Sequence, residues 1–186
     1  MDQRGLVERA QRGDHDAFAL LVRGAIARLD AAARLIIRDG ELARDAVQDT
    51  LIGAWRNLPG LRDPDRFDAW LHRLLVRACI DAIRRQKSRP IEVEITPLSG
   101  PSTPDIASGI ANRQLVDDAL QHLDPAWRAV VVLHFFLGMP LPEAAAALGI
   151  PVGTAKSRLH RSLGLMRSTI AGDGPGDPTL ARGHLA

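Results

Sequence analysis

Residues 88–109, SRPIEVEITPLSGPSTPDIASG, interrupt the chain with a stretch of Pro, Ser, Thr and Gly that has no helical period. This composition is typical of a flexible linker, because it offers few apolar side chains to a core and many residues that favour turns. On both sides of it apolar residues recur at steps of three and four, the spacing that places them on one face of a helix. The sequence therefore predicts an all-α protein with two small helical domains joined by a flexible linker. We expect the first domain at residues 1–87, the linker at 88–110, the second domain at 111–171 and a disordered tail at 172–186.

The apolar composition agrees with helix packing. Hydrophobic residues make up 46% of the 186 residues, but there are only four Phe, three Trp and no Tyr. The cores must then be built from Leu, Ala, Val and Ile, and one short stretch, Ile91 to Ile95, alone has a strand-like alternation. The length suits one ordinary domain or two small ones.

Sequence motifs for metal, redox or catalytic chemistry are absent. Cys79 is the single cysteine, so no disulfide forms within the chain, and no CxxC or Cys/His cluster offers a zinc site. The six histidines show no HExxH spacing, and there is no P-loop, GxGxxG or GxSxG motif. We expect no metal, no cofactor and no catalytic residue, and a reducing cytoplasm as the compartment.

No segment has the character of a membrane span. The N-terminal residues are polar, and the longest apolar run, Ala129 to Leu137, contains His134. That run is far shorter than the ~20 residues that cross a bilayer. We therefore expect neither secretion nor membrane insertion.

The second domain has the punctuation of a helix-turn-helix. Asp124 followed by Pro125 predicts a helix start, and Gly138 predicts its end after an apolar run that we interpret as one buried helix. A short helix from Pro142 closes at Gly149, and a last helix starts near Val152. A short helix, a tight turn with glycine and a second helix is the unit that places its second helix in the DNA major groove.

The last helix separates its side chains into two faces. Its buried stripe is predicted to be Ala155, Leu159, Leu163 and Met166. Its other face carries hydrogen-bond donors suited to phosphates and base edges: Lys156, Ser157, His160 and Arg161, with Arg158 at the flank. The net charge of +2 is by itself weak evidence for DNA, but nearly all the basic residues are Arg, which binds phosphate and guanine with two hydrogen bonds.

Residues 123–167 resemble the C-terminal promoter-reading domain of bacterial sigma factors, especially the small extracytoplasmic-function group. They read LDPAWRAVVVLHFFLGMPLPEAAAALG followed directly by IPVGTAKSRLHRSLGLMR. The specific core, GTAKSRLHR, is Gly153 to Arg161. The resemblance implies that Lys156, Ser157, His160 and Arg161 read the minus-35 element and that Arg158 contacts its backbone.

A helix predicted over ELARDAVQDTLIGAWRNL carries an unusual acidic face. Glu41, Asp45 and Asp49 follow one another at four-residue steps, where like charges cost an isolated helix roughly 0.2–0.5 kcal/mol per pair. The face is either a solvated surface, diluted by Arg44 and Arg56, or a patch that binds a basic partner. The stretch is similar to the sigma-factor segment that docks on the clamp coiled coil of the largest polymerase subunit, with Asp45, Gln48 and Asp49 at the matching positions.

The next helix, RFDAWLHRLLVRACIDAIRRQK, carries a basic stripe that consists of Arg66, Arg73, Arg77 and Arg84. Holding a separated DNA strand requires cations for its backbone and a stacking surface for an unpaired base. Phe67 and Trp70 are candidates for that surface, although an aromatic at helical spacing lies more often in a core. The segment resembles the family's minus-10 recognition and melting helix. Arg77 stands where the family usually has Asn, and His72 replaces a Tyr, which leaves the choice of base at the minus-10 element open.

The resemblance covers about residues 14–88 and 112–168 and implies two partners, core RNA polymerase, through its clamp coiled coil and flap region, and promoter DNA. An anti-sigma factor is a third candidate partner, because such proteins commonly hold the family inactive. The acids of the linker, Glu92, Glu94 and Asp105, either imitate a nucleic-acid strand near the polymerase active site or belong to a passive tether.

Two other functions compete with this interpretation. A stand-alone helix-turn-helix regulator needs a sensor or dimerisation domain, and the first domain has no ligand-binding or phospho-acceptor pattern. An enzyme needs a constellation of reactive side chains, which the motifs above do not supply. Binding to core polymerase separates the first alternative from a sigma factor.

Overall fold

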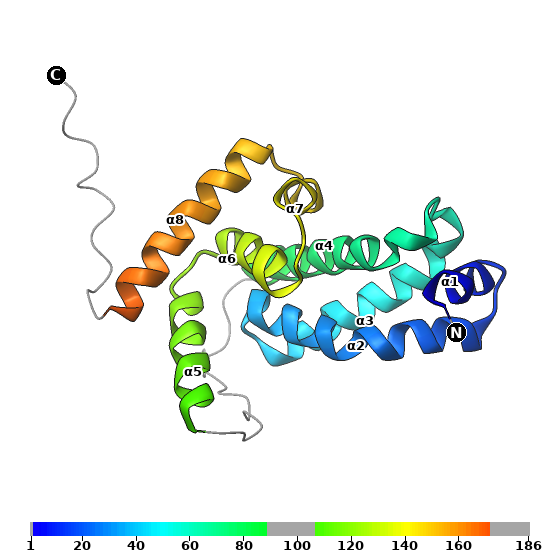
Figure 1. Ribbon diagram of the computed structural model, residues 1–186, viewed down its shortest axis with the longest axis horizontal. Coiled ribbons are helices and arrows are strands. Elements are labelled where there is room, and N and C mark those ends of the chain that lie inside the picture. Colours follow the sequence, from blue (N-terminus) through cyan, green and yellow to red (C-terminus); the bar gives the residue numbers. More distant parts are fainter. Residues whose placement is uncertain (1, 89–106, 172–186) are drawn as a thin grey trace.

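The computed structural model describes residues 2–88 and 107–171, and within these ranges every regular element is helical (Figure 1). The first group of helices is α1 (Gln3–Gln11), α2 (His15–Ile37), α3 (Gly40–Asn57), the 3₁₀ turns Leu58–Gly60 and Pro64–Arg66, and α4 (Phe67–Ser88). The second group is α5 (Ala107–Gln121), α6 (Pro125–Val131), a π-helical turn Val132–Phe136, α7 (Leu141–Leu148) and α8 (Val152–Ile170). The predicted all-α fold of two helical domains is confirmed. The predicted linker and tail lie largely outside the described residues, but α5 begins at Ala107, inside the predicted linker.

Helices α2, α3 and α4 form a three-helix bundle, and α1 packs across one end of it (Figure 1). Aspartates start two of these helices: the Asp14 carboxylate accepts from the Ala17 amide, and the Asp39 carboxylate accepts from the amides of Glu41 and Leu42. These bonds satisfy amide groups that have no partner within the helix. The breaks that the sequence predicts at residues 13–14 and 39–40 are therefore fixed by local chemistry.

The apolar run of the second domain is not one buried α-helix, and this prediction was wrong. After Val131 the backbone widens into a π-turn, in which the Leu137 amide donates to the Val132 carbonyl five residues back. One extra residue in a turn rotates the following side chains by roughly 100°. Phe135 is consequently 59% exposed, whereas Leu133 is fully buried.

Helices α7 and α8 form the predicted helix-turn-helix. Gly149 has φ +64°, in the left-handed region, and the amide of Ile150 donates to the Ala145 carbonyl at 3.0 Å. This hydrogen bond, from an amide to the carbonyl five residues earlier, is the one that commonly ends a helix at a left-handed glycine. Ala155 on α8 is fully buried, as the predicted stripe requires, and Ser162 joins it as a buried residue that the apolar pattern did not include.

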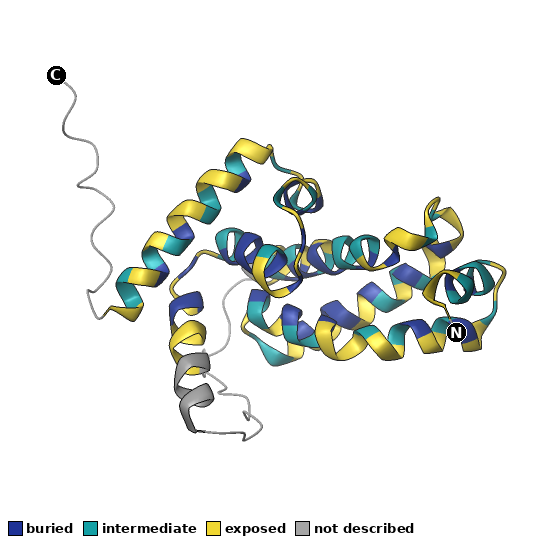
Figure 2. Cartoon of the chain, in the orientation of Figure 1, coloured by how far each residue is buried: buried dark blue, intermediate teal, exposed yellow. Residues whose placement is uncertain are grey.

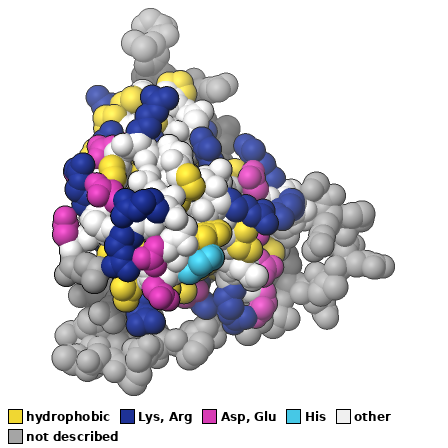
Figure 3. Space-filling model, turned by 90° about the vertical axis from the view of Figure 1, so that its right-hand side faces the viewer, with side chains coloured by type: hydrophobic (Ala, Val, Ile, Leu, Met, Phe, Trp, Pro, Cys, Tyr) yellow, Lys and Arg dark blue, Asp and Glu magenta, His cyan; other side chains and the backbone are white. Residues whose placement is uncertain are grey.

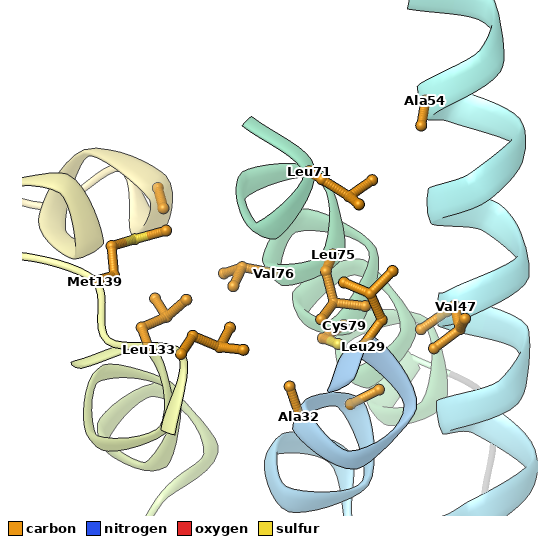
Figure 4. Close-up of a cluster of buried hydrophobic side chains, with 14 of the residues drawn as sticks. Leu29, Ala32, Val47, Ala54, Leu71, Leu75, Val76, Cys79, Leu133 and Met139 are labelled. Carbon is orange, nitrogen blue, oxygen red and sulfur yellow. The ribbon is translucent and has the colours of Figure 1, made fainter. Parts of the chain in front are cut away.

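The two domains share one hydrophobic core. Leu133 and Met139 of the second domain point toward Val76 of α4, which lies beside Leu75 and Leu29 of the bundle (Figure 4). A smaller cluster forms between α5, α6 and α8 and consists of Ala119, Leu120, Leu123, Val131 and Met166. In this structure the domains therefore pack against each other through apolar side chains, a contact that the sequence did not predict.

Two glycines give a matched test of the turn. A Cβ at Gly149 would meet no atom within 4 Å, so Gly149→Ala should destabilise the fold by about 1–2 kcal/mol through the left-handed backbone alone. Gly164 lies inside α8 and is equally unobstructed, so Gly164→Ala should stabilise by roughly 0.5–1 kcal/mol. Urea unfolding followed by circular dichroism measures both, and shifts of the same sign would contradict the assignment of the turn.

Candidate nucleic-acid interface

The outer face of α8 presents the predicted minus-35 set to solvent. Lys156, Ser157, His160 and Arg161 are exposed, and Arg158 is half-buried at the edge of the same face. Figure 2 shows α8 with a continuous exposed side along its length. The five side chains therefore lie on one helix, which begins directly after the turn at Gly149.

The N-terminal end of α8 adds favourable electrostatics. The first turn of α8 contains no acidic residue, so the partial positive charge of the helix N-terminus is not offset there. The Ser157 hydroxyl donates to the Thr154 carbonyl at 3.0 Å, which leaves its oxygen lone pairs as acceptors. The end can therefore receive phosphate on the helix amides and base edges on the side chains.

The arginines of the basic stripe on α4 have more partners within the protein than the basic side chains on the outer face of α8. Arg77 and Arg84 are exposed, and Arg84 lies 3.8 Å from Asp81. Arg73 is half-buried, and its Nε donates to the Ala69 carbonyl at 3.3 Å. Arg66, at the entrance to α4, forms a 2.5 Å ion pair with Glu143 of α7.

Phe67 does not offer a stacking surface, and this prediction was wrong. Its side chain is 1% exposed and lies in the core, because α4 starts at this residue and turns the ring toward the bundle. Trp70 is half-buried, with its ring centroid 6.0 Å from that of Phe67. Of the two aromatics, Trp70 alone has ring surface accessible to a base.

The acidic face of α3 is open. Asp45, Gln48 and Asp49 are all exposed on it, and Asp49 lies 3.3 Å from Arg85 of α4. Ile52, one turn further on, is 41% exposed. Ile52 was not among the site residues predicted from the sequence, because its residue type alone does not distinguish an exposed isoleucine from a buried one.

The surface at the end of the molecule beside α1 carries both positive and negative side chains, with neither sign forming a continuous patch. Figure 3 shows Arg and Lys side chains interspersed with Asp and Glu on this face. Arg4 pairs with Asp65 at 2.9 Å and Arg9 with Asp14 at 2.7 Å. These pairs brace α1 against the bundle and leave little excess charge to attract DNA.

Sequence reasoning missed the side chains that make polar contacts between the two domains. They are Arg28, Arg38, Glu143 and Arg128, and Arg128 is 6% exposed. Burial, with the nearby Arg38 cation as the next cause, lowers the pKa of Arg128 to about 10, so its guanidinium remains charged at neutral pH. The position of Arg128 within an apolar segment was the one signal in the sequence that it has a special role. Its partner, the Ile36 carbonyl at the end of α2, lies too far away in the sequence to be predicted.

The described residues contain no group of three or more His, Cys, Asp and Glu side chains that would hold a metal ion. No helix among them is long and apolar enough to cross a bilayer.

Two family models match the chain. Residues 21–89 match "Sigma-70 region 2", and residues 113–166 match "Sigma-70, region 4". The first range contains α3 and α4 with their acidic and basic faces, and the second contains the helix-turn-helix.

Curated relatives match over most of their length. The ECF RNA polymerase sigma factor SigM of Mycobacterium tuberculosis is 36% identical over 152 residues, which cover 81% of this chain and 75% of SigM. The RNA polymerase sigma-E factor of Streptomyces avermitilis is 34% identical over 139 residues, 75% of this chain and 76% of that protein.

Solved structures of two related complexes have the same fold. CnrH, in complex with the cytosolic domain of CnrY, aligns with a TM-score of 0.66 and 31% identity over 92% of this chain and 99% of CnrH. The sigma factor RpoE of Bartonella quintana, in complex with the anti-sigma factor NepR, aligns with a TM-score of 0.60 and 25% identity over 81% of this chain and 96% of RpoE.

The buried thiol provides a test of the core. Cys79 is fully buried, and burial raises its pKa to about 12. The thiol ionises near pH 8.5 in the unfolded chain, but in the folded chain it stays protonated until the pH approaches 12. Its contribution to the free energy of unfolding is therefore fully present below pH 8.5 and is lost as the pH rises toward 12. We expect a disulfide reagent at pH 8 to react at least about 100-fold more slowly with the native chain than with the chain in urea. Similar rates in the two conditions would contradict the packing.

Proposed function

The chain belongs to the extracytoplasmic-function group of the sigma-70 family, and we propose that it is a sigma factor that binds core RNA polymerase and directs promoter recognition, DNA melting and transcription initiation. The observation that carries the proposal is the presence of both region 2 and region 4 in one chain of this length. A sigma factor supplies contacts and leaves RNA synthesis to the polymerase, so we propose no catalytic role for any residue here. The cytoplasm, where the polymerase works, is the proposed compartment.

We propose that α8 reads the minus-35 element as duplex. Lys156, Ser157, His160 and Arg161 would contact base edges, and Arg158 the backbone. Their exposure on one face of a helix that follows a tight turn supports this role, because such a helix enters the major groove by its N-terminal residues.

The proposed minus-10 surface is the α4 stripe of Arg66, Arg73, Arg77 and Arg84, with Trp70 as the stacking side chain. Arginine spacing along one helix suits a strand whose phosphates repeat regularly, and a half-exposed indole suits an unpaired base. Arg77 would contact the strand where the family usually has Asn.

The proposed polymerase surface is the acidic face of α3. Asp45, Gln48 and Asp49 would dock on the clamp coiled coil, with Ile52 as an apolar contact one turn further along α3. A second contact, between the second domain and the flap region, would join the two domains across the polymerase. In this arrangement residues 1–87 and 111–171 act as separate binding domains joined by residues 88–110.

An anti-sigma protein is a proposed third partner. CnrH was solved with the cytosolic domain of CnrY and RpoE with the anti-sigma factor NepR, and both align with most of this chain. The hollow of about 530 Å³ between the first domain and residues 137–143 is large enough to admit side chains of such a partner.

Arg161→Ala should weaken binding to a cognate minus-35 duplex by about 1–3 kcal/mol, because the variant removes a base-reading guanidinium. Fluorescence anisotropy measures the change, and binding to core polymerase should stay the same. Arg167→Ala, an exposed arginine at the other end of α8, is the matched control. Equal losses for the two variants would contradict the groove assignment.

Charge reversal at Asp45 and Asp49 to Lys should weaken binding to core polymerase by at least about tenfold, because like charges would face each other across the interface. Affinity for the minus-35 duplex should not fall. The control reverses Asp16 and Asp118, which are exposed on α2 and α5. If the Asp45 and Asp49 variant joins core polymerase as well as this control does, the α3 assignment is wrong.

A further inference from the structure

Gly153 lies in the first turn of α8, on the exposed face of that helix. Lys156 and Ser157 follow it by three and four residues, so the three residues share one side of the helix. His160 lies one further turn along the same side. A residue without a side chain is therefore in line with the side chains that we propose for reading base edges.

The fold does not require a glycine at this position. Among the described residues, the glycines with a left-handed φ are Gly13, Gly138 and Gly149, and Gly153 is not one of them. A Cβ at Gly153 would meet no atom within 4 Å. The close contact between α7 and α8 needs a small residue, and the fully buried Ala155 supplies it. Because alanine favours a helix more than glycine does, the packing of the chain gives no reason for glycine here.

Other helical glycines also have open space, but their positions differ from that of Gly153. Gly24, Gly53 and Gly164 would each accept a Cβ without a contact within 4 Å. Gly24 and Gly53 lie on α2 and α3, which carry none of the proposed duplex contacts. Gly164 lies about 16 Å further along α8 at the rise of an α-helix, which exceeds the ~12 Å width of the major groove. Of these four glycines, Gly153 alone lies in the turn that would enter the groove first.

The side chains on either side of this glycine position lean toward it. In an α-helix the Cα–Cβ bonds tilt toward the N-terminus, so Lys156 and Ser157 lie over the turn that contains Gly153. The Ser157 hydroxyl has this direction, since it donates to the Thr154 carbonyl at 3.0 Å. The absence of a side chain at Gly153 allows the helix backbone to approach the surface that Lys156 and Ser157 touch.

The first turn of α8 offers apolar surface beside this glycine. Val152, its first residue, is 39% exposed. Side chains that bind phosphate carry a cation or a hydroxyl, and neither Val152 nor Gly153 has one. Base edges in the major groove include apolar surface, such as the thymine methyl group. The side chains of these two residues therefore suit van der Waals contact with a base edge better than contact with a phosphate.

We propose that the backbone of α8 at Gly153 lies directly against the edge of a base pair in the major groove, and that the missing side chain sets how deeply the helix enters. The proposal rests on the assignment of α8 to the minus-35 duplex made above. It adds a residue that makes no base-specific hydrogen bond but positions Lys156, Ser157, His160 and Arg161 against their bases. A methyl group at this position would hold the helix away from the floor of the groove, because a close-packed contact has no room for it.

Affinity for two duplexes tests this inference. The full unaltered chain first selects a short duplex from a random pool, and a shuffled duplex of the same composition is the nonspecific probe. Gly153→Ala should bind the selected duplex at least about fivefold more weakly, the lower end of the effect of an extra methyl group in a packed contact. Gly153→Val should bind it more weakly still. Affinity for the shuffled duplex should change by less than about twofold, because phosphate contacts supply most nonspecific binding.

Gly164→Ala is the matched control, because it makes the same change on the exposed face of the same helix, further from the groove. Its affinity for both duplexes should equal that of the unaltered chain. Urea unfolding followed by circular dichroism should give both alanine variants a midpoint at or above that of the unaltered chain, since alanine favours the helix. A loss of duplex affinity in Gly153→Ala is then separate from any loss of fold.

Three results would overturn the proposal. Gly153→Ala could bind the selected duplex as tightly as the unaltered chain does. It could lose affinity for the selected and shuffled duplexes to the same extent, which would place Gly153 beside a phosphate. It could also unfold at a lower urea concentration, which would mean that the fold itself needs the glycine.

Arg161→Ala separates this inference from the proposed function. If Arg161→Ala binds the selected duplex as tightly as the unaltered chain does, α8 does not read the duplex and both proposals fail. If Arg161→Ala weakens binding and Gly153→Ala does not, the assignment of α8 holds and the inference about Gly153 fails alone.

Discussion

The apolar seam between Leu133, Met139 and Val76 determines how the rest of this molecule is arranged. It joins a three-helix bundle to a helix-turn-helix unit that shares no secondary structure with it, and it brings α7 over α4. Burial of apolar surface is the main favourable term in such packing, and the polar contacts of Arg28 and Arg128 fix its orientation. The position of α7 against α4 follows from this one contact.

The three surfaces that we propose for binding differ in the side chains that they expose. The α8 face that we propose for duplex DNA is a set of exposed donors, and the α3 face that we propose for the polymerase is a set of exposed carboxylates beside an apolar side chain. The α4 stripe has its cations partly engaged by α7 and by its own helix.

Local patterns predicted the local structure well. Helix starts at Asp14, Asp39 and Asp124 and the left-handed Gly149 follow from side-chain capping and backbone sterics, which act within a few residues. The exposure of Phe135 and the burial of Phe67 were not predictable in this way, because a π-turn and the packing of the bundle decide them. The contact of α7 with α4 joins residues far apart in the sequence, and no periodicity encodes it.

We propose that this one chain gives core RNA polymerase its choice of start site through two DNA-binding surfaces. Transcription by purified core polymerase from a library of promoter fragments, with and without this chain, and sequencing of the RNA 5′ ends, tests it most directly. We expect a small set of start sites that depend on the chain and share two sequence elements at a fixed spacing. The same distribution of 5′ ends with and without the chain would contradict it.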